Sequence, residues 1–305
     1  MAHEHPTAPL FPGFERHRAE VEPGVRIAAL VGGSGPPLLL LHGHPQTHVI
    51  WHRVAAELAR THTLVLADLR GYGDSDKPAG LADHSTYSKR TMARDQVRLM
   101  QSLGFERFDV LAHDRGARVA HRLAIDEPAS VGRMVLLDIA PTLAMYEQTS
   151  RDFATAYWHW FFLIQRAPLP ERLIEADPAA YVHDVMGSRS AGLAPFAPQA
   201  LAEYARCLAL PGAARALCED YRAAASIDLE HDRADRDAGR RMRTPTLVLW
   251  GEQGVVHRCF EPLQEWHRVA TDVRGEAIAC GHYIAEEAPE LLLRHVRNFL
   301  AHAPS

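Results

Sequence analysis

Apolar segments of strand length alternate with segments of helical periodicity over the first 141 residues of the chain. Four segments have the continuous apolar runs that are typical of strands buried on both faces: 36–43 (PPLLLLHG), 62–71 (HTLVLADLRG), 108–114 (FDVLAHD) and 133–141 (RMVLLDIAP). Helical patterns lie between them, at 51–60, 91–104 and 115–128. This order predicts an α/β protein with a mostly parallel sheet that is covered by helices on both faces.

Residues 142–235 interrupt the alternation. They have helical patterns, are rich in aromatic residues (AYWHWFFL, 156–163) and contain no convincing strand. A strand pattern returns at 244–251 (TPTLVLWG), and a helical pattern closes the chain over 289–302. We therefore predict three parts: a first core segment at 1–141, a helical cap at 142–235 and a second core segment at 236–305. The cap is expected to lie over the carboxyl ends of the strands, where open α/β sheets bind their ligands.

Charge and composition argue against several classes of protein. A net charge of −5 gives no electrostatic basis for binding nucleic acid or an anionic membrane. No apolar run reaches the ~18 residues that a membrane-spanning helix needs. The four cysteines are scattered without a CxxC pair, which indicates reduced thiols in a cytoplasmic protein. His42 and His44 lack a third ligand at a suitable spacing, so no metal is expected. The GGSG segment (32–35) precedes a strand and not a helix, so it is no phosphate-binding loop, and no cofactor is expected.

The segment LAHDRGAR (111–118) stands between a predicted strand and a predicted helix. In a strand–turn–helix elbow, the third residue of a small-x-nucleophile-x-Gly pattern is held above the edge of the sheet. That residue is Asp114, and both the helix N-terminus and Arg115 favour its ionised form. A carboxylate at this place is suited to displacing a leaving group from an sp³ carbon. The alternative is a structural role as the N-cap of the helix.

His282 follows the last predicted strand, where a fold with this elbow places its general base. Hydrolases of this kind often place the third residue, an acid, in a WGxxD pattern, but Gly254 holds that position here. Asp138 ends the strand that follows the elbow, and we predict that it pairs with His282. Glu252 is the weaker alternative, and a strand-end cap is the structural one for Asp138.

Two further groups surround the elbow. Arg115 and Arg118 lie three residues apart on the helix, hence on one face, and guanidinium groups bind carboxylates in bidentate fashion. They predict a small carboxylate as substrate unless they form structural ion pairs with acids of the cap. The loop after 36–43 and the residue after the nucleophile supply the amides of an oxyanion hole in this fold, here the backbone N–H groups of His44 and Arg115.

With these residues in place, the chain resembles the fluoroacetate dehalogenases of the α/β-hydrolase superfamily, almost from end to end. The most specific segments are HDRGAR (113–118), LDIAPT (137–142), AYWHWFF (156–162), DYRAAASID (220–228) and GHY (281–283). The resemblance implies that Asp114 is the nucleophile, that Asp138 and His282 hydrolyse the ester, and that Arg115 and Arg118 hold the carboxylate. It also implies that the departing halide is bound by three residues of the cap: His159, Trp160 and Tyr221. Without the resemblance, the aromatic segment would be interpreted as cap core.

The resemblance implies a cofactor-independent hydrolase that converts fluoroacetate or another short 2-haloacid to a 2-hydroxy acid, and a homodimer. Two positions depart from the family: His44 replaces the aromatic residue of an HGFP loop, and Ser188 stands where a bulky aromatic is expected. Both bear on the range of substrates more than on the reaction.

Two alternatives remain. An epoxide hydrolase would use the same aspartate with Tyr221 and a second cap tyrosine, namely Tyr146, Tyr157 or Tyr204. A non-catalytic ligand receptor would not need Asp114, Asp138 and His282 together.

Overall fold

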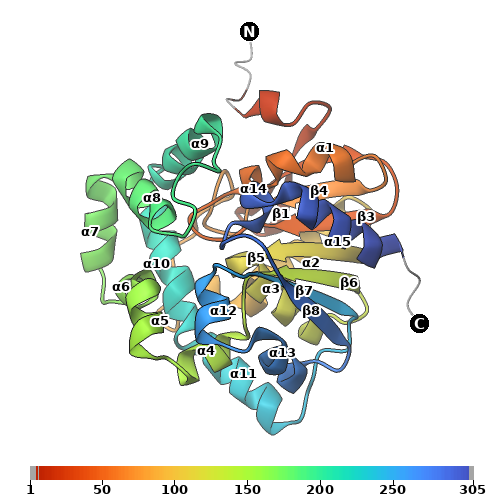
Figure 1. Ribbon diagram of the computed structural model, residues 1–305. Coiled ribbons are helices and arrows are strands. Elements are labelled where there is room, and N and C mark those ends of the chain that lie inside the picture. The colour runs from red at the N-terminus through yellow and green to blue at the C-terminus, as the bar shows by residue number, and fades with distance from the viewer. Residues whose placement is uncertain (1–4, 6, 302–305) are drawn as a thin grey trace.

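The computed structural model describes residues 5 and 7–301, and its centre is one eight-stranded sheet (Figure 1). The strand order is β1-β2-β4-β3-β5-β6-β7-β8. Strands β1 and β2 pair antiparallel, as do β2 and β4, and every other neighbouring pair is parallel. The bounds are β1 Glu15–Glu22, β2 Val25–Gly33, β3 Pro37–Leu41, β4 Thr63–Ala67, β5 Phe108–His113, β6 Val131–Leu137, β7 Thr246–Gly251 and β8 Val273–Ile278.

The core helices stand in the connections between these strands and at the C-terminal end. They are η1 Ala8–Leu10, η2 His48–Arg53, α1 Ala55–Leu58, η3 Ser85–Tyr87, α2 Lys89–Ser102, α3 Asp114–Asp126, α12 Val255–Cys259, α13 Pro262–Val269, α14 Ile284–Glu287 and α15 Pro289–Ala301. None of the described helices is both long enough and apolar enough to span a membrane.

Between β6 and β7 the chain forms only helices, which gather on one side of the sheet in Figure 1. They are α4 Thr142–Glu147, α5 Arg151–Ala156, α6 Trp158–Leu163, α7 Leu169–Ala176, α8 Pro178–Gly187, α9 Pro198–Leu208, α10 Ala213–Ala224 and α11 Ile227–Asp237. The predicted mostly parallel sheet with an inserted helical cap is therefore confirmed. The limits of the three parts, 1–141, 142–235 and 236–305, stay a prediction.

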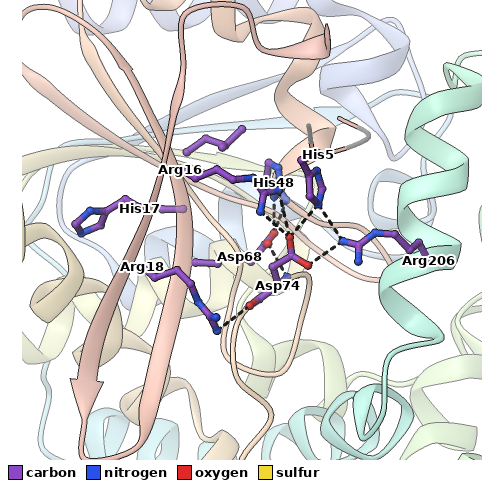
Figure 2. A pocket seen from close by; sticks show the side chains of 11 residues that line it. His5, Arg16, His17, Arg18, His48, Asp68, Asp74 and Arg206 are labelled. Carbon is purple, nitrogen blue, oxygen red and sulfur yellow. Dashed lines mark hydrogen bonds and ion pairs between the residues drawn. The ribbon is translucent and has the colours of Figure 1, made fainter. Parts of the chain in front are cut away.

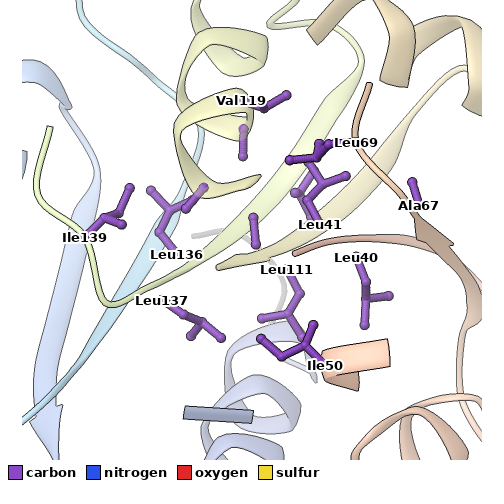
Figure 3. Close-up of a cluster of buried hydrophobic side chains, with 14 of the residues drawn as sticks. Leu40, Leu41, Ile50, Ala67, Leu69, Leu111, Val119, Leu136, Leu137 and Ile139 are labelled. Atoms are coloured by element: carbon purple, nitrogen blue, oxygen red, sulfur yellow. The ribbon is translucent and has the colours of Figure 1, made fainter. Parts of the chain in front are cut away.

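The continuous apolar runs form the central strands because those strands are covered on both faces. Leu40 and Leu41 are completely buried, and consecutive side chains of a strand point to opposite faces. Figure 3 shows the result: Leu41 points toward Val119 of α3, whereas Leu40 points toward Ile50 of η2. This packing fixes the carboxyl ends of β3, β5 and β6 side by side, and the candidate site lies at these ends.

Candidate active site

Asp114 stands at the predicted elbow, directly after β5 and at the first position of α3. Its φ is +43°, a left-handed conformation that costs a non-glycine residue free energy and that a surrounding structure must enforce. Gly116 makes the tight turn possible, because a Cβ there would lie 2.5 Å from the carbonyl oxygen of His42. The elbow therefore presses the start of α3 against the end of β3.

The two carboxylate oxygens of Asp114 have different surroundings. Oδ2 accepts a hydrogen bond from the backbone N–H of His44 at 3.1 Å. Oδ1 accepts no hydrogen bond from the described residues. Burial alone would raise the pKa of Asp114, but electrostatic interactions with His282 and Arg118 outweigh it and hold this pKa well below its ordinary value. The carboxylate is therefore ionised, and Oδ1 is the oxygen available for attack.

Gly43 explains how the loop after β3 can approach this carboxylate. A Cβ at Gly43 would lie 2.5 Å from the Cβ of Asp114 and 2.9 Å from its Oδ2. Only glycine leaves room for the amide of His44 to reach the carboxylate. Of the two predicted oxyanion donors, the amide of His44 thus contacts Asp114 directly.

His282 and Asp138 form a hydrogen-bonded pair beside Asp114. Nδ1 of His282 lies 2.6 Å from Oδ2 of Asp138, and both side chains are buried. Oδ1 of Asp138 accepts the backbone N–H of Gly251 at 3.0 Å, which fixes the carboxylate. A carboxylate on Nδ1 orients the imidazole and leaves Nε2 to take a proton.

Position distinguishes Asp138 from Glu252 as the partner of His282. The side chain of Glu252 is exposed, whereas Asp138 contacts His282. Gly254, where related hydrolases place an acid, packs against Asp138, because a Cβ there would lie 3.2 Å from Oδ1. A larger side chain at position 254 would therefore crowd the carboxylate of Asp138.

Arg118 is a buried cation whose hydrogen bonds all go to uncharged groups. Its Nη1 donates to the carbonyl of Ala140 and to Oγ1 of Thr142, and Nη2 contacts the sulfur of Met145. Its Nε has no partner, and within the described part of the chain no carboxylate lies within 4.0 Å of the guanidinium. Burial lowers the pKa of Arg118 below its ordinary value. Burying a cation costs free energy unless an anion binds to it.

Arg115, by contrast, is already paired. Its Nε and Nη2 donate to the two oxygens of Asp220 on α10 at 2.8 Å each, and Asp220 also accepts from Lys89 and from the hydroxyl of Tyr72. Nη1 of Arg115 is left without a partner among the described residues. One side of the Arg115 guanidinium thus forms a structural ion pair with Asp220, and its Nη1 can still donate to another group. Asp220 directly precedes Tyr221 in the DYR segment, but no pattern in the sequence marks it as the partner of Arg115.

The three cap residues implied by the resemblance come together over the elbow. His159 and Trp160 lie on α6 and Tyr221 on α10, with the ring of Tyr221 centred 6.0 Å from His159 and 6.3 Å from Trp160. Nε1 of Trp160 and the hydroxyl of Tyr221 are buried without a partner in the described structure. The guanidinium of Arg115 lies 4.1 Å from the centre of the Tyr221 ring.

The pKa values of Tyr221 and His159 make both side chains hydrogen-bond donors. Burial raises the pKa of Tyr221 well above its ordinary value, so the hydroxyl keeps its proton. Burial lowers the pKa of His159 well below its ordinary value, so the ring is uncharged and carries one N–H. Unpaired buried donors cost free energy, and their convergence indicates a site for an acceptor or an anion.

An opening of about 310 Å³ between cap and core reaches His282. Its rim includes Trp158, Ser188 and Arg189 from the cap, and Gln253 from the core. Ser188, where the family resemblance leads us to expect a bulky aromatic, is exposed on this rim and donates to the carbonyl of Val185. The departure therefore affects the mouth of the site.

A second pocket, of about 520 Å³, lies away from Asp114 between β1, β2 and the cap helix α9 (Figure 2). His5, Asp74 and Glu203 bring ligand atoms within 4.8 Å of one another there. Nη2 of Arg206 already occupies the space among them, at 2.8 Å from Asp74, 2.7 Å from Glu203 and 3.4 Å from His5. A guanidinium thus satisfies the groups that a metal ion would need.

Comparisons with known proteins identify relatives of this chain. Residues 36–289 match the family model of the alpha/beta hydrolase fold. The chain is 46% identical to a fluoroacetate dehalogenase of Burkholderia sp. over 297 residues, which covers 97% of each chain. It is 32% identical to a soluble epoxide hydrolase of Corynebacterium sp. (strain C12), covering 93% of this chain and 96% of that one.

Among solved structures, one from Nostoc sp. PCC 7120 that is provisionally described as an α/β hydrolase is 52% identical. It superposes with a TM-score of 0.92 and covers 95% of this chain and 99% of its own.

Proposed function

Because the chain belongs to the α/β-hydrolase family, we propose that it is a hydrolytic dehalogenase of short 2-haloacids such as fluoroacetate. The proposal rests mainly on the surroundings of Arg118. This cation is only 3% exposed, its charge lowers the pKa of Asp114, and it has no carboxylate partner in the described chain. A small carboxylic acid would supply the missing anion and would bring its Cα to the nucleophile. The free Nη1 of Arg115 offers a second donor to the same carboxylate.

The reaction proceeds in two steps. Oδ1 of Asp114 attacks the carbon that bears the halogen, the carbon–halogen bond breaks, and the halide leaves toward the donors of His159, Trp160 and Tyr221. The product of this step is an ester of Asp114. A carboxylate is suited to this displacement because it is ionised and already oriented.

In the second step, His282 takes a proton from water, and the resulting hydroxide attacks the carbonyl carbon of the ester. Asp138 stabilises the imidazolium through the 2.6 Å contact with Nδ1. The negative charge on the carbonyl oxygen faces the amides of His44 and Arg115. The bond between the carbonyl carbon and the alkyl oxygen then breaks, His282 returns the proton to that oxygen, and the 2-hydroxy acid leaves.

The test is the release of halide ion from fluoroacetate, chloroacetate and bromoacetate, measured against the Asp114→Asn variant. We expect release of halide together with stoichiometric formation of glycolate by the unaltered chain, and none by the variant. No release from any of the three acids would overturn the proposal.

An epoxide hydrolase is the second candidate, and one observation favours it. The hydroxyls of Tyr146 and Tyr221 are both buried without partners among the described residues, so two tyrosines could protonate an epoxide oxygen. The identity with the Corynebacterium epoxide hydrolase is consistent with this candidate. It leaves Arg118 without an anion, however. Diol formation from styrene oxide without halide release from haloacetates would favour it.

We further propose that the protein is cytoplasmic and forms a homodimer. The four cysteines are unpaired, which suits a reducing compartment. The family resemblance supports a dimer, and Leu169 and Leu173 of α7 expose apolar side chains that a second copy could cover. Light scattering at several concentrations tests the oligomeric state.

A further inference from the structure

His44 places an imidazole among the proposed halide donors. Its backbone N–H contacts Asp114, and its side chain is 2% exposed. The ring stacks on that of His159, with centroids 5.4 Å apart and an interplanar angle of 12°. It meets the ring of Tyr221 edge-on at 5.3 Å. His44 therefore touches two of the three residues assigned to the halide.

The two ring nitrogens of His44 have different surroundings. Nε2 lies 3.2 Å from the hydroxyl of Tyr181 on α8. Nδ1 is buried and has no partner among the described residues. Burial lowers the pKa of His44 to about 3, so the ring is uncharged near neutral pH and carries one proton on one of the two nitrogens.

The hydroxyl of Tyr181 selects between the two tautomers. If it donates to Nε2, the proton of the ring is on Nδ1, which then is a donor without an acceptor. If it accepts from Nε2, Nδ1 carries a lone pair and cannot donate. An anion beside Nδ1 stabilises the first tautomer and disfavours the second.

We propose that Nδ1–H of His44 is a fourth hydrogen-bond donor to the departing halide, beside the donors of His159, Trp160 and Tyr221. The inference rests on the proposed dehalogenase function and deepens it, because it assigns a leaving-group preference to one residue. The aromatic residue of the HGFP loop has no N–H to offer. His44 consequently favours fluoride, which is small, accepts short hydrogen bonds and leaves carbon poorly without assistance.

Two substitutions test the two ring nitrogens of His44 one at a time. In His44→Asn the amide nitrogen can take the place of Nδ1, and in His44→Gln it can take the place of Nε2. His44→Phe removes both and installs an apolar ring. The measurement is the pre-steady-state burst of halide from fluoroacetate and from bromoacetate, expressed as the ratio of the two rates. Bromide leaves readily, so its burst reports whether a variant is folded and able to form the ester.

We expect His44→Phe and His44→Gln to lower the ratio of the fluoride to the bromide rate on the order of 100-fold, at the lower end of the effects seen when a donor to a developing anion is removed. His44→Asn should keep most of the ratio. An unchanged ratio in all three variants would overturn the inference and leave the proposed function intact. Retention by Gln with loss in Asn would also overturn it, because Nε2 would then be the important atom. Absence of any halide release by the unaltered chain would instead overturn the proposed function.

Discussion

Nδ1 of His282 lies 2.6 Å from Oδ2 of Asp138, although 144 residues separate them in the chain. The contact joins the loop after β8 to the end of β6, and both groups are buried next to Asp114. In the proposed reaction this pair serves the second step alone. The two steps should therefore be separable by mutation.

Replacing His282 by Ala should leave alkylation of Asp114 possible and stop hydrolysis of the ester. We expect one equivalent of halide per active site from bromoacetate and a stable adduct on the peptide that carries Asp114, detected by mass spectrometry. His267→Ala, which truncates an exposed histidine, is the control and should turn over normally. Halide release without an adduct would show that Asp114 does not form the ester.

Isotope placement tests the nucleophile independently. In a single turnover in ¹⁸O-labelled water, the hydroxide attacks the carbonyl carbon of the ester, so the label should enter the carboxylate of Asp114. The oxygen of the first glycolate formed should be unlabelled, because it comes from Oδ1. Label in that first glycolate would mean that water attacks the substrate carbon directly.

Replacing Arg118 by Met should weaken the binding and turnover of haloacetate. The loss of a hydrogen bond to a charged group should reduce kcat/KM by the equivalent of ~1.5–3 kcal/mol. Haloacetamide is uncharged and should lose much less. Arg122→Met is the matched control, because Arg122 lies one turn further along α3 and pairs with Asp232 and Asp235. Equal losses for acid and amide in Arg118→Met would assign Arg118 a structural role.

Replacing Tyr221 by Phe should slow the release of fluoride far more than that of chloride or bromide. Removing a donor to a developing anion costs ~2.7–4 kcal/mol, and fluoride depends most on such donors. His159→Asn should act in the same direction. Tyr87→Phe removes a buried tyrosine hydroxyl whose acceptor is the carbonyl of Pro78, and it should not alter the halide order. Equal slowing of all three halides would return Tyr221 to a packing role.

Glu286 makes the stability of the fold depend on pH. Burial raises the pKa of this carboxyl to about 8, and the side chains of Gln46 and Tyr204 surround it. The folded state therefore holds a proton that the unfolded chain releases above its ordinary pKa of 4.5. The resulting stabilisation is fully present below pH 4.5 and is lost as pH rises through about 8.

Glu286→Gln keeps the shape of this side chain and removes its titration. Thermal melts from pH 5 to 9 should show the unaltered protein losing stability relative to this variant as pH rises. Glu290→Gln, on the exposed face of α15, is the reference. Parallel curves for the unaltered protein and Glu286→Gln would contradict a protonated Glu286.

The central parallel strands could be predicted because burial on both faces requires continuous apolar runs. β1 (ERHRAEVE) could not, because it is an edge strand with charged residues at most positions. The helix expected at 51–60 is divided into η2 and α1, and residue 54 separates the two. Helical periodicity does not distinguish these two forms, since a 3₁₀ turn and an α turn place apolar residues at similar spacings.

The gathering of Asp114, Asp138 and His282 was predictable, because parallel strands bring their carboxyl ends to one edge. The pairing of Arg115 with Asp220 was not, because it joins α3 to α10 across 105 residues and no local pattern marks it. The same holds for the contact between His44 and Tyr181, which spans 137 residues. Contacts between core and cap depend on how the cap is docked, and the spacing of residues within either part does not encode that docking.

The ion pairs of Asp220 affect how substrate and product enter and leave the site. It binds Arg115 from the core and Lys89 from the start of α2 while standing on a cap helix. An outward movement of α10 would separate Asp220 from Arg115 and Lys89. Breaking a buried ion pair costs about 3–5 kcal/mol. We therefore expect the cap to stay closed during turnover, with reactants and products passing the rim beside Arg189. With the cap closed, we expect short 2-haloacids to reach Asp114 more readily than bulkier ones.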